Sequence, residues 1–161
     1  GETVLTAGEG VLNKKLIIAW ALVFVVWMVG NFLIHAVLLS NDYGQLPNLY
    51  RTEAQTMRYF PLEILAHVIM AGAFTWIYSQ GVAVKPWLPQ GLRFGVAVAL
   101  LTAVPTYLIY YSVQPLPGPL VVKQVVSSAI LVVLLGVLAA FLYRQAPTHA
   151  TAPAPASGHG G

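Results

Sequence analysis

Four long apolar runs, each of about 20 residues, constrain the fold of this chain more than any other feature of its sequence. They cover residues 16–39, 61–79, 94–113 and 121–143. A helix rises about 1.5 Å per residue, so each run can cross a hydrocarbon layer of about 30 Å. The strands of a membrane barrel would alternate in polarity over about ten residues, and the sequence lacks such segments. The pattern therefore predicts four transmembrane helices.

The composition supports a membrane protein and excludes several other classes. Of the 161 residues, 58% are hydrophobic and only 8% are charged, whereas soluble domains carry roughly 25% charged residues. No basic run is present, so no surface for nucleic acid is predicted. The absence of cysteine excludes disulfides, iron–sulfur clusters and thiolate metal sites.

Short, turn-rich breaks between the runs predict an all-α, integral membrane four-helix bundle with up-down topology. The first run is too long for the apolar core of a cleaved signal peptide, so it is expected to remain as a span. The sequence thus divides into an N-terminal segment (1–15), a transmembrane domain (16–143) and an Ala/Pro/Gly-rich tail (144–161) that is expected to be disordered.

The lysine and arginine residues predict the orientation of the bundle. With both termini in the cytoplasm, five basic residues fall on the inner side and three on the outer side. Basic residues favour the cytoplasmic side, so N-in and C-in is expected. The inner five are Lys14, Lys15, Lys85, Arg93 and Arg144, and the outer three are Arg51, Arg58 and Lys123.

Polar residues within the spans collect in the half of the bundle that this orientation places outside. A polar group in lipid is costly, so each of them calls for a partner or a role. Asn31 and His35 are four residues apart and are expected to share a helix face, as are Glu63 and His67. Both histidines lie at a similar predicted depth. The remaining candidates, which could line a cavity there with Asn31, are Thr106, Tyr107, Tyr110 and Gln124.

Four interpretations of the two histidines remain open. In the structural one, the imidazoles and Asn31 form interhelical hydrogen bonds, and Glu63 lies in the first turn of a helix that begins at Pro61. In the second, His35, His67 and Glu63 bind a metal ion. In the third, one histidine from each helix holds a b-type haem. In the fourth, the polar residues line a pocket for a small organic ligand or a quinone.

Pro105 and a set of small residues predict how the third and fourth spans are shaped and packed. Pro105 removes a backbone donor from the third span and is expected to kink it, which would open a cavity lined by Tyr107 and Tyr110. Residues with little or no side chain let helices approach closely, either within the bundle or against another subunit. They form a stripe on each span: Gly95, Ala99 and Ala103 on the third, and Gly136 and Ala140 on the fourth.

Several short motifs resemble those of a known family. They are residues 30–35 (GNFLIH), 59–61 (YFP), His67, 91–95 (GLRFG) and 107–115 (YLIYYSVQP). On these motifs, residues 27–144 resemble a family of small, uncharacterised four-span inner-membrane proteins of proteobacteria. The resemblance implies a membrane protein in a bacterial setting, and it implies no activity.

The sequence contains no metalloprotease motif, phosphate-binding glycine loop or catalytic triad order, so an enzyme is not expected. We predict a non-catalytic, polytopic protein of the bacterial inner membrane that is an accessory subunit of a larger membrane complex. Its predicted partners are the lipid bilayer and other membrane subunits. The alternative is a membrane protein that binds a metal, haem b or a small ligand through His35 and His67.

Overall fold

The computed structural model describes residues 13–144, and these residues form helices joined by short loops, without strands. The predicted N-terminal segment and C-terminal tail lie largely outside the described residues. The helices, in chain order, are α1 (Lys14–Phe32), the π-helix η1 (Leu33–Leu38), α2 (Ser40–Gly44), α3 (Glu53–Gln80), α4 (Trp87–Leu101), α5 (Ala103–Val113) and α6 (Gly118–Tyr143).

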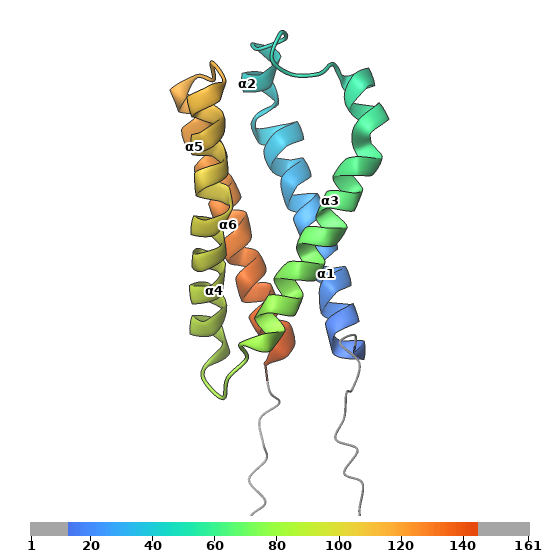
Figure 1. Cartoon of the computed structure of the whole chain (residues 1–161), viewed down its shortest axis with the longest axis vertical. Helices are drawn as coiled ribbons and strands as arrows, with labels where there is room; N and C mark the ends of the chain where they lie inside the picture. Colours follow the sequence, from blue (N-terminus) through green and yellow to red (C-terminus); the bar gives the residue numbers. More distant parts are fainter. Residues whose placement is uncertain (1–12, 145–161) are drawn as a thin grey trace, which may run out of the picture.

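These segments build an up-down bundle of four long apolar units, as predicted (Figure 1). Each unit is long and apolar enough to span a membrane: Lys14–Leu38, Glu53–Gln80, Trp87–Val113 and Gly118–Tyr143. One end of the bundle holds α2, and we call it the α2 end. The other holds the start of α1, the end of α6 and the α3–α4 loop, and we call it the terminal end.

The start of α3 differs from the prediction. The helix begins at Glu53, because Thr52 and Gln55 form a capping box in which each side chain bonds to the other residue's backbone N–H. Pro61 therefore lies inside the helix rather than at its first position, and Glu63 is in its third turn. The expectation that Glu63 caps a helix N-terminus was wrong, since a stronger cap lies upstream.

The third span is interrupted near Pro105, as predicted. The break falls at Thr102, between α4 and α5, where the backbone leaves helical geometry with φ −118° and ψ −72°. Pro105 has no N–H to donate to the carbonyl of Leu101. The Thr102 hydroxyl donates instead to the carbonyl of Val98, at 2.7 Å, and holds the turn before the break.

Small residues pack α4 directly against α6. Gly95 and Ala99 are buried on α4, and Gly136 is buried on α6. A Cβ placed on Gly95 would lie 2.6 Å from the Cα of Val133, and one on Gly136 would lie 2.7 Å from the Cα of Gly95. The two backbones are thus too close for larger side chains, and the predicted packing role of these stripes is confirmed.

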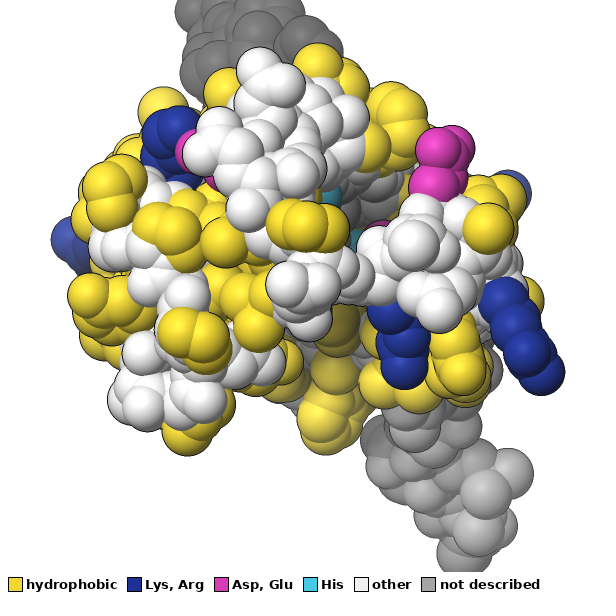
Figure 2. Space-filling view, turned by 90° about the horizontal axis from the view of Figure 1, so that it is seen from above, with side chains coloured by type: hydrophobic (Ala, Val, Ile, Leu, Met, Phe, Trp, Pro, Cys, Tyr) yellow, Lys and Arg dark blue, Asp and Glu magenta, His cyan; other side chains and the backbone are white. Residues whose placement is uncertain are grey.

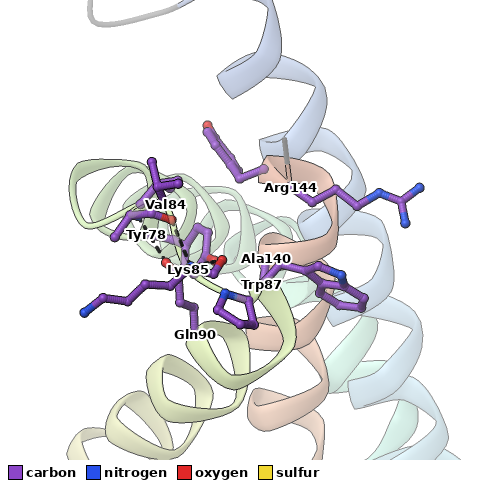
Figure 3. Close-up of a pocket in the computed structure, with 11 residues that line it drawn as sticks. Tyr78, Val84, Lys85, Trp87, Gln90, Ala140 and Arg144 are labelled. Atoms are coloured by element: carbon purple, nitrogen blue, oxygen red, sulfur yellow. Dashed lines mark hydrogen bonds between the residues drawn. The ribbon is translucent and has the colours of Figure 1, made fainter. Parts of the chain in front are cut away.

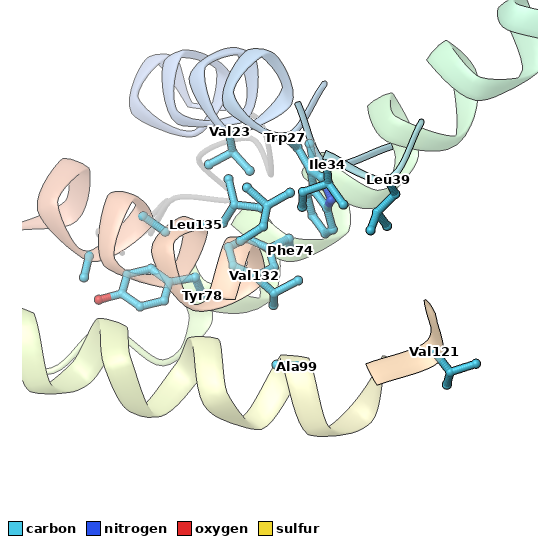
Figure 4. Close-up of a cluster of buried hydrophobic side chains, with 14 of the residues drawn as sticks. Val23, Trp27, Ile34, Leu39, Phe74, Tyr78, Ala99, Val121, Val132 and Leu135 are labelled. Atoms are coloured by element: carbon cyan, nitrogen blue, oxygen red, sulfur yellow. The ribbon is translucent and has the colours of Figure 1, made fainter. Parts of the chain in front are cut away.

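The apolar core lies between α1, α3 and α6 in the middle of the bundle (Figure 4). Trp27 packs edge-to-face on Phe74, and Val23 and Leu135 are fully buried beside them. Because α1 and α3 cross (Figure 1), the first half of α3 diverges from the other helices. Every residue of α3 from Glu53 to Ala66 is exposed within the chain.

Candidate functional site

His35 lies in the π-helix η1, and this local geometry decides where its side chain goes. The N–H of Leu39 donates to the carbonyl of Ile34, five residues earlier, at 2.9 Å. The wider turn reduces the rotation per residue below the roughly 100° of an α-helix. Asn31 bonds to α3, whereas His35 bonds to α2 and α5. Although Asn31 and His35 are four residues apart, their side chains therefore contact different elements.

Hydrogen bonds join His35 to two tyrosines. Its Nδ1 lies 2.6 Å from the hydroxyl of Tyr43 on α2, and its Nε2 lies 3.4 Å from the hydroxyl of Tyr107 on α5. The first is a short hydrogen bond, and the second is near the upper limit of length. The imidazole thus bridges α2 and α5.

Both tyrosines are in turn tied to α6. Gln124 Nε2 donates to the Tyr43 hydroxyl at 3.1 Å, and the Ser128 hydroxyl donates to the Tyr107 hydroxyl at 3.2 Å. Gln124 and Ser128 are four residues apart and lie on one buried face of α6. The five side chains form a hydrogen-bonded series that begins and ends on α6, and we call it the His35 ring.

The His35 ring has unused hydrogen-bonding capacity. If His35 carries its proton on Nδ1, Tyr107 donates to Nε2 and the hydroxyl hydrogen of Tyr43 is unused. If the proton is on Nε2, Tyr43 donates to Nδ1 and the hydroxyl hydrogen of Tyr107 is unused. Gln124 is buried, at 4% exposure, and its Oε1 accepts no hydrogen bond from any described residue. One donor and one acceptor therefore remain in either tautomer.

The phenols at the α2 end stay protonated at neutral pH. Burial raises the pKa of Tyr43 to about 12, and a hydrogen bond from Gln124 opposes this shift only in part. Burial also raises the pKa of Tyr50, whose ring lies 4.7 Å from that of Tyr43. Both hydroxyls are therefore neutral groups that can donate or accept a hydrogen bond.

An open pocket of about 610 Å³ adjoins the His35 ring. Four tyrosines form much of its wall, and Arg51 is its only charged lining residue. Figure 2 looks onto this end of the molecule, and histidine side chains are visible deep in a recess there. The lining residues are His35, Tyr43, Leu49, Tyr50, Arg51, Tyr107, Tyr110, Gln114, Leu116 and Gln124.

The predicted cavity residues divide into two groups. Tyr107, Tyr110 and Gln124 lie on the pocket wall, whereas Asn31 and Thr106 do not. Thr106 is exposed on α5. Tyr43 was not predicted as a site residue, because it lies beyond the first apolar run and belongs to the separate helix α2.

His67 belongs to a second, separate set of contacts. Its Nδ1 donates to the backbone carbonyl of Glu63, at 2.8 Å, which leaves Nε2 as the acceptor for the amide of Asn31, at 2.6 Å. The imidazole is 5% exposed and lies edge-on to Trp27. His67 therefore links α3 to α1 with both ring nitrogens engaged.

The two histidines do not turn toward one another. Nε2 of His67 is directed to Asn31 and Nε2 of His35 to Tyr107, whereas a shared haem iron or metal ion would need both to present a lone pair to one point. Glu63 is exposed on α3. Within residues 13–144, no group of three or more histidine, aspartate or glutamate side chains could hold a metal ion.

Comparisons of the chain with protein-family models, with curated proteins and with solved structures found no match.

Proposed function

We propose that this protein is a non-catalytic, multi-pass inner-membrane protein that binds a small, neutral, amphipathic molecule in the pocket at the α2 end. The observation that carries the proposal is the Oε1 of Gln124, a residue that lines the pocket; this oxygen is buried and lacks a hydrogen-bond partner among the described residues. A buried polar group without a hydrogen bond costs about 1–3 kcal/mol, so a ligand that supplies the donor is favoured.

The His35 ring suggests the chemistry of the ligand. It leaves one phenolic donor and one amide acceptor, which a single hydroxyl, phenol or amide group on the ligand satisfies together. No carboxylate lines the pocket, so a cation finds no counter-charge there. The tyrosine walls suit an apolar or aromatic body.

Removal of the acceptor tests this proposal. The protein is extracted gently from membranes, and co-purified small molecules are identified by mass spectrometry in the wild type, Gln124→Leu and Gln45→Leu. Gln45 is an exposed residue outside the pocket, so it provides the same substitution as a control. We expect one molecule near stoichiometric amount in the wild type and in Gln45→Leu, and about tenfold less in Gln124→Leu.

Equal amounts in all three proteins, or only phospholipid in the wild type, would contradict this function. Thermal unfolding of each variant shows whether Gln124→Leu retains the fold. His35→Phe removes the centre of the His35 ring while keeping an aromatic side chain, and it should lower ligand content to a similar extent.

A second observation favours a role as an accessory subunit of a larger membrane complex. Glu63 lies on α3, about 26 Å along the helix from Gln80, and its carboxylate is exposed without an ion pair among the described residues. A carboxylate at such a position is costly against lipid, and a polar group on a partner helix would reduce that cost. The uncovered first half of α3 offers the surface for such a partner.

Site-directed photocrosslinking tests this role. A photoreactive residue at Leu62 should capture a defined partner protein in intact membranes. The same residue at Ile17, an exposed apolar position on α1, should capture only lipid. Lipid adducts alone at both positions would argue against an accessory subunit that docks on α3.

A further inference from the structure

The charges of the described residues are distributed unequally between the two ends of the bundle. Both signs occur toward the α2 end, where Figure 2 shows blue and magenta side chains together. The acidic residues of the described part, Asp42, Glu53 and Glu63, all lie in that half. At or near the terminal end the described residues include five cations and no acid; the cations are Lys14, Lys15, Lys85, Arg93 and Arg144.

A second open pocket, of about 360 Å³, lies among these cations. It is formed by the α3–α4 loop and the ends of α3 and α6, and Lys85 and Arg144 are among its lining residues (Figure 3). Lys15 lies over the ring of Tyr143, another lining residue, at 5.0 Å. Two cations therefore line this cavity, with the guanidinium of Arg144 over the ring of Phe141, and a third cation packs on one of its walls.

The loop that borders this pocket is held by side-chain bonds. Gln90 accepts from the N–H of Ala83 at 3.1 Å and donates to the carbonyls of Ala83 and Lys85, each at 2.9 Å. Figure 3 shows the side chains of Lys85 and Arg144 extending to opposite sides. The cations thus flank the opening instead of clamping one point.

Two further groups in the pocket suit an anion. The hydroxyl oxygen of Tyr143 is buried and has no hydrogen-bond partner among the described residues. The 15-residue helix α4 starts at Trp87, beside the pocket, with no side chain capping its first N–H groups. Such a helix start carries partial positive charge. Each of these groups would gain from an oxygen with negative charge.

The position of the pocket identifies the source of that anion. It lies where the apolar stretches end at Gln80 and Tyr143 and begin again at Trp87. Trp87, Tyr78 and Tyr143 line it, and tryptophan and tyrosine concentrate at the depth of lipid headgroups. A group bound here is at the height of a phospholipid phosphate, with exposed apolar helix beside it for acyl chains.

We propose that the pocket at the terminal end binds the phosphate headgroup of an anionic phospholipid. The phosphodiester charge is balanced by Lys85, Arg144 and Lys15, and Tyr143 donates its hydroxyl hydrogen to a phosphate or ester oxygen. Each basic residue near an anionic membrane surface contributes about 1 kcal/mol. This site is independent of the pocket at the α2 end.

Native mass spectrometry of the full-length protein with added phosphatidylglycerol or phosphatidylcholine tests the site. The wild type should retain phosphatidylglycerol in preference to phosphatidylcholine. The double variant Lys85→Gln/Arg144→Gln should bind phosphatidylglycerol at least about tenfold more weakly. Tyr143→Phe, which removes only the hydroxyl, should weaken binding about threefold to tenfold.

A charge-matched control distinguishes lipid binding in the pocket from a general attraction of anionic lipid to the positively charged terminal end. Lys14→Gln/Arg93→Gln removes two cations from the same end that do not line the pocket, and it should change binding by less than about threefold. Equal losses in both double variants would overturn the proposal, as would equal retention of the two lipids by the wild type. Displacement of the lipid by millimolar inorganic phosphate would assign the site to a free anion instead.

Discussion

At the scale of single residues, both histidines within residues 13–144 have their two ring nitrogens occupied by this chain's own groups. His67 bridges a backbone carbonyl and Asn31, and His35 bridges two tyrosines. The interpretation of the histidines as interhelical hydrogen-bonding groups accounts for three of these four bonds, and the fourth, from His67 to the carbonyl of Glu63, lies within α3. Only the His35 ring has an unused hydrogen-bond donor and acceptor beside a pocket. The two histidines are therefore similar in sequence context but different in their surroundings.

The pair formed by Asn31 and His67 should be energetically coupled. A double-mutant cycle with Asn31→Ala and His67→Ala, measured by unfolding in detergent, is expected to give a coupling of about 1 kcal/mol, since hydrogen bonds between membrane helices are of this size. As a control, His67→Ala combined with Ser112→Ala, an exposed residue of α5, should be additive. Additivity for the first pair would show that the bond contributes nothing to stability.

Tyr43 should make the folded state sensitive to alkaline pH. Burial raises its pKa from 10 to about 12, so the folded protein keeps the phenolic proton at pH values where the unfolded chain has lost it. The stabilisation that this group contributes is complete below about pH 10 and is lost as the pH rises toward 12. Melting temperatures from pH 9 to 12 should fall less steeply in Tyr43→Phe than in the wild type. A control in the exposed Tyr111, Tyr111→Phe, should follow the wild type.

At the scale of helices, the tightest contact is between α4 and α6, and it tolerates little added volume. Gly91 and Gly95 face Gly136 and Ala140 across it. Ala99, at 4% exposure, belongs to the same stripe. These residues bring the backbones of α4 and α6 together. Because α5 follows α4 directly, this contact also determines where Tyr107 lies relative to α6.

Ala99→Leu should destabilise the bundle by about 1–3 kcal/mol, because the added methylenes have no space between the helices. Val96→Leu, at a position on α4 that is 46% exposed, adds bulk toward the outside and should have little effect. Thermal unfolding of the two variants in one detergent makes the comparison. Equal stability of the two variants would mean that α4 and α6 can move apart to admit the larger side chain without loss of unfolding free energy.

The sequence predicted correctly the spans, which depend on the length of an apolar run. It did not predict the start of α3 or the π-helix, which depend on local backbone geometry. All four spans were found, because a run of about 20 apolar residues has few alternatives in a membrane protein. The start of α3 was missed, because Pro61 is a strong signal for a first turn but the capping box at Thr52 lies upstream. The π-helix was missed because one wider turn leaves no mark in hydrophobic periodicity.

Only some members of the site were predictable from the sequence. Tyr107, Tyr110 and Gln124 were identified because polar residues in apolar spans are few. The partners of each side chain depend on helix rotation, which the π-helix changes after Phe32. The sequence placed His35 and Asn31 on one helix face, but it did not indicate that His35 bonds to Tyr43 and Tyr107.

At the scale of the whole molecule, the uneven charge predicts how the bundle is inserted. With five cations and no acid among the described residues at the terminal end, basic residues should hold that end in the cytoplasm. A reporter fused after the last residue should therefore be active as a cytoplasmic fusion and inactive as a periplasmic one. The opposite result would place the pocket at the α2 end inside the cell.

The π-helix has a further consequence for the architecture. A π-turn contains about one residue more than a turn of α-helix. In an α-helix one residue corresponds to about 100° of rotation. Because five residues of a π-turn complete about the same rotation as four residues of an α-helix, deletion of Val37 is expected to return this segment to regular α-helix and to leave α2 on the same side of α1. Tyr43 should then stay beside α6, and Asp42 should keep its 2.9 Å ion pair with Lys123. The extra residue is thus absorbed within one turn, and the rim of the pocket keeps its place on the bundle.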